Sequence, residues 1–346
     1  MVRGRARAGI GAALLAAAVA AALLFRFAAG GEPVVLKLAF FSSDRTHLYL
    51  SSIKPFVDAV NAEGAGRVRI DVHFSGGLGK DLTKQTRLLR DGLADIAHVV
   101  PSYESASFSD AAVIELPGLF KDAREATLAA AQLIETDVIR GFKDYFVIGV
   151  YVTEPETVHS RTRIASLADL DGRRIRVSND TEMDVLSRLG VVASFIPLYE
   201  VASAISHGEV DGALGSPITI TEFGIGRVAT NHYFLPTSCV AHVLMMTRAR
   251  FDGLPADVQA LIRKFSGRWF GDTYIRINEA VIATIMKQLA DDPRRKIVFP
   301  SETDRQRAEA IFRAVADDYA AQNIHNAALV EAARAAVTAL RDEVGR

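Results

Sequence analysis

Residues 166–190 read "SLADLDGRRIRVSNDTEMDVLSRLG", a helical turn, a strand and an amphipathic helix in direct succession. On the strand, Ile175 and Val177 alternate with arginines. Successive side chains on a strand point to opposite faces, so one face is apolar and the other carries Arg174 and Arg176. The apolar face predicts a place in a buried sheet. The other face raises the question of whether one guanidinium group points into a cleft that receives an anion.

The same alternation of elements continues on both sides of this stretch. Residues 34–40 form a strand-like run rich in branched side chains, and residues 47–64 place apolar side chains at helical spacing. Strands that alternate with helices predict an α/β protein with mixed sheets that helices cover on both faces. An unusually long helical pattern follows over residues 255–289, and Gly267 and Gly271 in its middle indicate a bend.

Length and charge limit the classes of protein that the chain can represent. Its 346 residues, 49% of them hydrophobic, are enough for a large core and for two lobes. The 40 Lys and Arg side chains nearly balance the 41 Asp and Glu side chains, which leaves a net charge of -1. No stripe of basic residues is present, so we expect no nucleic-acid partner.

Residues 1–31 have the layout of an export signal. Three arginines precede the uncharged apolar run Ala8–Phe25, and small residues follow it. This order is typical of a secretory signal peptide. The run is also close to the shortest length that spans a membrane, about 18 residues, so an uncleaved N-terminal anchor is the alternative. Either interpretation places the rest of the chain outside the cytoplasm, in the periplasm.

The sequence lacks the common signatures of enzymes and metal sites. It contains no G-x-S-x-G elbow, no H-E-x-x-H and no P-loop. The segment "GIGRVA" at residues 224–229 formally matches a dinucleotide-binding pattern, but it does not open a helix after a buried strand. His98 and His242 lie in apolar runs and are interpreted as core histidines, and the lone Cys239 as a small buried hydrophobe. We therefore expect no enzymatic activity, no cofactor and no metal.

A series of motifs from Val34 to Gln322 resembles a known family. The motifs are "LKLAFF" followed by His47, "FSGGLGKD", "LRDGLADIAHV", "IELPGLFKD", "LADLDGRRIRV", "IPLYEVASAISHGEVDGAL" and "RFDGLPADVQALI". In this order and spacing they resemble the solute-binding subunit of tripartite ATP-independent periplasmic (TRAP) transporters, the DctP-type family. No single motif is decisive, but seven in register are specific.

The resemblance implies a two-lobed periplasmic-binding-protein (venus flytrap) fold of the α/β class, with mixed sheets and a long helix that spans both lobes. The expected divisions are a signal peptide or anchor at 1–31, lobe I at 32–153 with about 244–255 and part of 290–320, lobe II at 154–243 with part of 256–300, the spanning helix at 256–290 and a C-terminal helix at 323–346.

The resemblance also implies where the ligand binds. The arginine that ends the "RIRV" strand in the family pairs with the ligand carboxylate, which corresponds to Arg176. A guanidinium group suits this role because it binds a carboxylate in a bidentate manner and stays charged when desolvated. Weaker correspondences place further ligand contacts at Phe40, Phe41, His47, Pro101, Ser102, Tyr103, Tyr151, Thr153, Leu214, Gly215 and Ser216.

Two departures from the family pattern bear on the ligand. The chain reads "ALGSP" where the family commonly has Gln-Glu-Asn-Pro, so a side-chain amide is lost. The second arginine of the family's pocket is also missing, because "YVTEPETVHSR" offers Thr153, Glu154 and Glu156 instead. These acidic residues count against a simple dicarboxylate. A monocarboxylate with a hydroxyl, amide or amine group remains open.

The function that the resemblance implies is that of an exported receptor. It would capture a small organic acid between its lobes and deliver it to the membrane permease subunits of a TRAP transporter. The alternative is a ligand-binding sensor subunit that docks on a membrane receptor.

Overall fold

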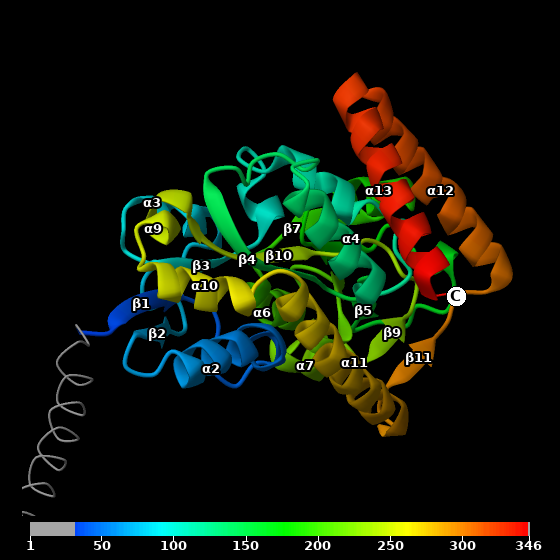
Figure 1. Cartoon of the computed structure of the whole chain (residues 1–346). Helices are drawn as coiled ribbons and strands as arrows, with labels where there is room; N and C mark the ends of the chain where they lie inside the picture. The colour runs from blue at the N-terminus through cyan, green and yellow to red at the C-terminus, as the bar shows by residue number, and fades with distance from the viewer. Residues whose placement is uncertain (1–31, 345–346) are drawn as a thin grey trace, which may run out of the picture.

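The computed structural model describes residues 32–344, and the expected signal peptide or anchor at 1–31 lies outside them. The described part of the chain forms two sheets, and helices pack around each of them (Figure 1). We call the first sheet with its helices lobe I and the second sheet with its helices lobe II.

Lobe I is built on a five-stranded sheet. Its strands are β1 (Val34–Ala39), β2 (Val68–His73), β3 (Ile96–Val99), β4 (Tyr145–Val152) and β10 (Ala241–Thr247). Their order is β2-β1-β3-β10-β4, with β1 parallel to β2 and β3, and β10 antiparallel to both of its neighbours. The helices are α2 (Lys54–Glu63), α3 (Gln85–Arg90), α4 (Ala123–Glu135) and α9 (Arg248–Asp252), and the short turns are Tyr49–Ile53, Leu82–Lys84, Pro101–Glu104 and Ser109–Glu115. Apolar side chains of the strands and of these helices pack together and bury the sheet.

Lobe II is built on a six-stranded sheet. Its strands are β5 (Thr157–Ser160), β6 (Arg174–Val177), β7 (Val192–Phe195), β8 (Gly212–Gly215), β9 (Asn231–Tyr233) and β11 (Lys296–Val298). Their order is β11-β9-β5-β8-β6-β7, and β6 runs parallel to both β7 and β8. The helices are α5 (Asp180–Arg188), α6 (Val201–His207), α7 (Pro217–Glu222) and α8 (Ile225–Val228), and the short turns are Leu167–Leu170 and Leu198–Glu200. The turn, strand and helix expected over residues 166–190 are all present.

Extended segments connect the two lobes. The chain passes from β4 to β5 through residues 153–156 and returns to lobe I through residues 234–240. Backbone hydrogen bonds of 2.8 and 3.0 Å join these segments. The returning strand β10 begins at Ala241, slightly before the boundary near residue 244 that the sequence suggested.

The single helix expected over residues 256–290 is in fact two helices. These are α10 (Ala256–Lys264) and α11 (Arg268–Asp291). Gly267 separates them with a φ of 57°, a backbone conformation that residues with a Cβ atom rarely adopt. The freed amide of Gly267 donates a hydrogen bond of 2.8 Å to the carbonyl of Ile148 in β4, which fixes the break against lobe I.

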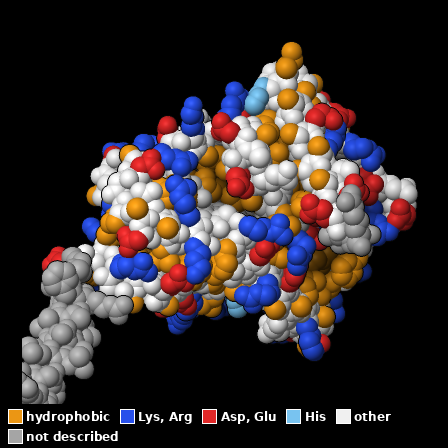
Figure 2. All heavy atoms as spheres, viewed as in Figure 1, with side chains coloured by type: hydrophobic (Ala, Val, Ile, Leu, Met, Phe, Trp, Pro, Cys, Tyr) orange, Lys and Arg blue, Asp and Glu red, His pale blue; other side chains and the backbone are white. Residues whose placement is uncertain are grey.

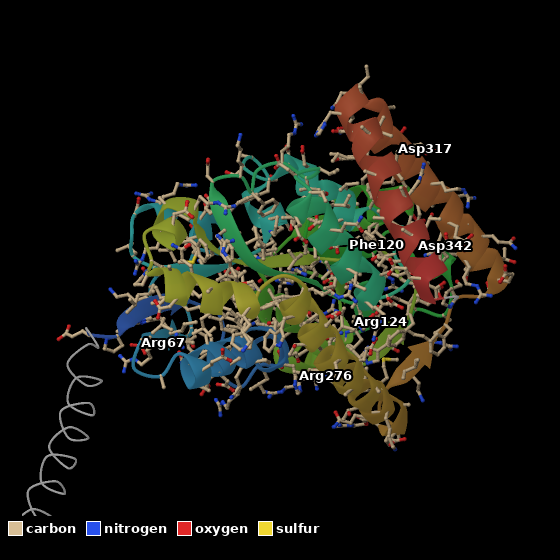
Figure 3. All side chains as sticks on the ribbon, viewed as in Figure 1. Arg67, Phe120, Arg124, Arg276, Asp317 and Asp342 are labelled. Carbon is tan, nitrogen blue, oxygen red and sulfur yellow. The ribbon has the colours of Figure 1, made fainter. Side chains whose placement is uncertain are left out.

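Helix α11 contacts both lobes. Near its start, the Phe270 ring covers Gly149 of β4 so closely that a Cβ atom there would lie 2.2 Å from the ring. Farther along, Glu279 forms an ion pair with Arg124 at the start of α4, with an N–O distance of 2.8 Å, and Figure 3 shows Arg124 beside α11. The helix also packs against α7 of lobe II.

The C-terminal helices α12 (Glu302–Ala321) and α13 (Ile324–Val344) form a long pair on one side of the molecule (Figure 1). Phe312 of α12 packs into the core of lobe II, and Ala316 of the same helix packs into the core of lobe I. Helix α13 covers α4 of lobe I and corresponds to the helix expected at 323–346. This pair therefore bridges the lobes on the side away from β1.

Charged side chains of both signs are interspersed on the face shown in Figure 2, in keeping with the nearly neutral net charge. No helix within residues 32–344 is both long and apolar enough to cross a membrane.

Candidate functional site

A small cavity lies where the two lobes meet. Lobe I and the segments next to it contribute Phe41, Leu48, Leu82, Val100, Tyr103, Thr153, Val240 and His242, and lobe II contributes Glu156, Arg176, Ser178, Leu198 and Thr219. The space between these side chains is about 30 Å³. Typical ligand pockets are roughly 300–1,000 Å³, so the lobes are closed tightly on one another.

Larger grooves lie elsewhere on the molecule, but the charged side chains that line the two described next are exposed rather than buried. One of about 740 Å³ lies between the loop at residues 116–121 and the helices α12 and α13. The other, of about 620 Å³, lies between β4, the end of α4 and the break at Gly267. Buried charged groups with shifted pKa values mark functional sites more reliably than volume does, so the interlobe cavity is the candidate site.

Arg176 is the most buried charged side chain of the cavity, with only 1% of its surface exposed. Its Nε donates a hydrogen bond of 2.8 Å to the carbonyl of Ile196, and its Nη1 donates one of 2.7 Å to Ser178 Oγ. Nη1 also lies 3.4 Å from the carbonyl of Leu214. Its Nη2 is buried and has no acceptor in the part of the chain that the structure describes. The guanidinium group is thus held in place while one donor nitrogen remains available.

Arg174 lies on the same strand two residues earlier and has a different role. Its side chain is exposed, and its Nη2 forms an ion pair of 3.1 Å with Asp211. Alternation puts both arginines on one face of β6, so the position along the strand separates them. Arg176 lies at the end of the strand that meets lobe I, and Arg174 at the solvent end.

Two buried carboxyl groups accompany Arg176. Glu156 is 3% exposed, and its carboxylate accepts a hydrogen bond of 3.4 Å from Ser178 Oγ. Glu182 is 0% exposed and accepts hydrogen bonds of 2.6 Å from the Ser178 amide and 2.9 Å from Ser238 Oγ. Burial and the nearby charge of Glu182 raise the pKa of Glu156 well above its usual value, and Arg176 only partly offsets this. Glu156 lines the cavity, whereas Glu182 lies behind it.

The opposite side of the cavity is aromatic. The rings of Phe41 and His98 lie 5.4 Å apart, and the rings of Tyr151 and His242 stack at 4.7 Å. His98 Nε2 lies 2.8 Å from the Tyr151 hydroxyl and 3.2 Å from His242 Nδ1. Burial lowers the pKa of His242 to about 3, and burial together with His242 lowers that of His98. Both histidines are therefore neutral at neutral pH; His98 is a core residue as the sequence predicted, whereas His242 is buried but also lines the cavity.

Aromatic contacts cross the cleft between the lobes. Phe41 of lobe I stacks on Phe223 of lobe II with ring centroids 6.5 Å apart and planes at 11°. Tyr103 of lobe I meets Phe195 of lobe II edge to face at 5.8 Å.

A polar contact also crosses the cleft. The carboxylate of Glu222, at the end of α7 in lobe II, accepts a hydrogen bond from the backbone amide of His47 in lobe I. His47 begins a helical segment, so the carboxylate caps a helix N-terminus that belongs to the other lobe. Burial raises the pKa of Glu222 to about 7, although the amides of His47 and Leu48 counteract this.

The structure brings four of the residues expected at the site together around the cavity. These are Phe41, Tyr103, Thr153 and Arg176. Pro101 begins the short turn that carries Tyr103, and Leu214 contributes the carbonyl near Arg176.

Other expected site residues lie just behind this lining. Phe40 is 1% exposed and packs behind Phe41, and Tyr151 is fully buried next to His98 and His242. His47 contributes its backbone amide to Glu222.

The remaining expected residues have structural contacts. The Ser102 hydroxyl is buried beside the Glu115 carboxyl group. The carbonyl of Gly215 is the partner of His159 Nε2 at 3.0 Å. Ser216 caps helix α7, because its hydroxyl accepts a hydrogen bond of 3.3 Å from the Thr219 amide.

Several lining residues were not identified from the sequence. Ser178 could have been found, because it lies two residues after Arg176 and so shares its face of the chain. The others come from helices, loops and strand ends that carry no chemical signature; they are Leu48, Leu82, Val100, Leu198, Thr219 and Val240. Within residues 32–344, no three His, Cys, Asp or Glu side chains are grouped as a metal site.

Comparisons with known proteins give one consistent result. A family model described as bacterial extracellular solute-binding protein, family 7 (DctP), matches residues 41–323. A solute-binding protein of Sulfitobacter sp. strain NAS-14.1 is 26% identical over 329 residues, which cover 94% of this chain and 98% of that protein.

Solved structures share the fold. A TRAP solute-binding protein of Rhodoferax ferrireducens, in complex with copurified benzoate, has a TM-score of 0.83 at 23% identity and covers 90% of this chain and 100% of its own. A TRAP solute-binding protein from a marine metagenome, specific for aromatic acid ligands and bound to 3-hydroxybenzoate, has a TM-score of 0.82 at 22% identity and covers 89% and 99%.

Proposed function

The chain belongs to the bacterial extracellular solute-binding protein family 7, and on that premise we propose that it captures a small monocarboxylic acid between its lobes. The protein works in the periplasm and delivers this ligand to the membrane permease subunits of a TRAP transporter. It catalyses no reaction and needs no cofactor.

One observation carries this proposal. Nη2 of Arg176 is a charged donor that is buried at the interlobe cavity and has no acceptor within residues 32–344. A buried donor without a partner costs about 1–3 kcal/mol, and more when it is charged. A ligand carboxylate would remove that cost through a charge-assisted hydrogen bond, which is stronger than a neutral one.

The cavity lining explains how the rest of such an acid is held. Phe41, Leu48, Leu82 and Val100 offer apolar surface to the body of the ligand. The aromatic acids bound by the two structural relatives make benzoate and 3-hydroxybenzoate natural first probes. Because the closed cavity holds only about 30 Å³, the ligand must enter while the lobes are apart and make side chains such as Tyr103 and Leu198 move aside.

Closure follows from differential binding. A ligand favours the closed form only to the extent that it binds that form more tightly. In this chain the carboxylate anchor comes from lobe II and the aromatic surface from lobe I, so only the closed form offers both. The lobes proposed for this movement are residues 32–152 with 241–255 and residues 157–233, joined by the segments at 153–156 and 234–240.

Two matched variants test the proposal. Isothermal titration calorimetry with a panel of monocarboxylic acids, including benzoate and 3-hydroxybenzoate, should give at least one ligand with a measurable Kd. Arg176→Met should then abolish that binding and leave the thermal unfolding cooperative. Arg174→Met removes a guanidinium group from the same strand and should leave the affinity unchanged. Binding that survives Arg176→Met would show that the anchor is elsewhere.

A further inference from the structure

The charges around the cavity are unusual for a site that receives an anion. Within residues 32–344, Arg176 is the only Lys or Arg that lines the cavity, and Glu156 lines it as well. Glu182 lies behind them and shares Ser178 as a hydrogen-bond partner with Glu156. One guanidinium group therefore stands against two buried carboxyl groups before any ligand enters.

This balance disfavours a ligand that is only an anion. If Glu156 and Glu182 share one proton, their single negative charge already balances Arg176, and a bound carboxylate adds an unbalanced buried charge. Buried unbalanced charges are costly. A ligand that brings its own positive charge avoids this cost, because it adds no net charge to the cleft.

The Glu156 carboxylate can accept further hydrogen bonds, so it can bind a positively charged group of a ligand. In the described part of the chain, and apart from the neighbouring Glu182 carboxyl group, the long contact of 3.4 Å from Ser178 Oγ is the only hydrogen bond that its carboxylate accepts. An ionised carboxylate can accept about four hydrogen bonds. Burial and then the charge of Glu182 raise the pKa of Glu156, and Arg176 is the only cation that offsets them, so a second cation beside Glu156 would be stabilised there.

Arg176 and Glu156 are neighbouring groups of opposite charge type, a guanidinium group and a carboxyl group. Ser178 Oγ accepts the 2.7 Å hydrogen bond from Arg176 Nη1 and donates the 3.4 Å one to Glu156. Both side chains line the same small cavity, one with a donor nitrogen that lacks an acceptor and the other with a carboxylate that accepts only a long hydrogen bond from Ser178. A ligand with a carboxylate and a cationic nitrogen on neighbouring atoms complements both.

We propose that the ligand of this chain is a zwitterionic amino or imino acid, with its carboxylate on Arg176 and its charged nitrogen on Glu156. This assignment rests on the proposed function and adds the residue that selects among carboxylic acids. Glu156 is then the specificity-determining residue of the cleft.

The wild-type protein can test this without any substitution. Calorimetry would compare phenylacetate, mandelate and phenylglycine, which carry hydrogen, hydroxyl and ammonium at the same carbon, and the parallel series propionate, lactate and alanine. In at least one series the ammonium member should bind at least about tenfold more tightly than the hydroxyl member, because hydrogen bonds to charged groups are the strongest. A hydroxyl or hydrogen member that binds best in both series would overturn the assignment.

A pair of isosteric variants tests the residue. Glu156→Gln should reduce the affinity for the ammonium member by at least about tenfold and leave the hydrogen member as tightly bound or tighter. Glu182→Gln neutralises a carboxyl group of the same cluster that does not line the cavity, so the preference for the ammonium member should persist. Loss of the preference in Glu182→Gln but not in Glu156→Gln would refute the role of Glu156.

The results separate this inference from the proposed function. If acids bind and depend on Arg176 but show no preference for the ammonium member, the proposed function stands and this inference fails. If none of the six probes, benzoate or 3-hydroxybenzoate binds, both fail.

Discussion

The two sides of the cleft differ in kind. The lobe I side presents Phe41, Leu48, Leu82 and Val100 with the neutral His242, and no charged side chain. The lobe II side presents Arg176 and Glu156, which hydroxyl and carbonyl groups hold in place. We refer to these as the aromatic side and the charged side.

This difference separates two tasks that a single pocket would have to combine. Apolar area contributes binding free energy with little discrimination, whereas buried charged groups discriminate strongly, because a mismatched ligand leaves them unpaired. Under the proposed function, the aromatic side sets how much surface the ligand buries, and the charged side sets which ligand is accepted. Substitutions on the two sides should therefore change ligand binding in different ways.

The largest effect is expected from a change on the charged side that keeps the charge. Arg176→Lys retains one positive charge but loses the planar group that contacts Ile196 and Ser178 and that we propose to bind the ligand carboxylate. Affinity for the best acid of the panel should fall roughly 30-fold or more, about 2 kcal/mol, in calorimetry. Arg174→Lys is the matched control. An affinity within threefold of the wild type would mean that the charged side acts through its net charge alone.

The second prediction concerns a residue behind the aromatic side. Tyr151→Phe removes the hydroxyl that lies 2.8 Å from His98 Nε2 in a fully buried place. The free energy of unfolding in urea should fall by about 1–3 kcal/mol, because a buried polar atom loses a partner. Affinity should stay within about twofold, since Tyr151 does not line the cavity. A large loss of affinity at unchanged stability would mean that this hydroxyl reaches the ligand.

A smaller effect is expected at the aromatic surface itself. Phe41→Ala removes a ring that lines the cavity and stacks on Phe223 across the cleft. Affinity should fall about tenfold, or about 1.4 kcal/mol, for all acids of the panel alike. Phe299→Ala, at a ring that is 66% exposed, should change nothing. If Phe41→Ala altered the order of preference among the acids, the division of tasks between the two sides would be wrong.

The smallest effect concerns how stability depends on pH near the cleft. Burial, followed by the charges of Glu182 and Asp180, raises the pKa of Glu115 to about 8 from 4.5, although Ser102 counteracts this. A raised carboxyl pKa gives a contribution to stability that is complete below about pH 4.5 and is lost as the pH rises through about 8. Thermal unfolding should therefore show a loss of about 1 kcal/mol between about pH 7 and pH 9, which Glu115→Gln reduces.

The buried histidines of the aromatic side act in the opposite direction. Burial lowers the pKa of His242 to about 3, so its contribution is complete above about pH 6.5 and is lost as the pH falls toward 3. Glu115→Gln should leave this acid side of the stability profile unchanged. An unchanged alkaline side in that variant would show that Glu115 is not the group that titrates.

Much of the architecture could be predicted from the sequence, because it depends on local patterns. The alternation around Ile175 and the helix after it define the strand β6 and α5, and the same reasoning applies to the other strand and helix pairs. The long helix was predicted as one element because periodicity does not show where a backbone changes direction. Gly267 was noted as a weak point, but its contact with Ile148 depends on the tertiary fold.

The site was predicted less completely, for a physical reason. Alternation on the strand could not separate Arg176 from Arg174, and Arg176 was singled out by its position at the end of the strand together with the family resemblance. The burial of Glu156 and its pairing with Ser178 depend on how two distant segments meet. The same is true of lining residues such as Leu82 and Thr219, whose types are common in any helix or loop.

The cap that Glu222 provides has a kinetic consequence. The first turn of the helix at His47 is completed by a carboxylate from the opposite lobe, so this turn is fully satisfied only when the lobes meet. Closure therefore gains a hydrogen bond whether or not a ligand is present, but it also buries the carboxylate, whose Oε2 has no partner within residues 32–344 and whose pKa rises to about 7. Since the closed cavity is too small to admit an acid, capture must wait for an opening event. The association rate would then reach a maximum at high ligand concentration, equal to the rate of opening. Glu222 would influence that maximum rate, although it does not line the cavity.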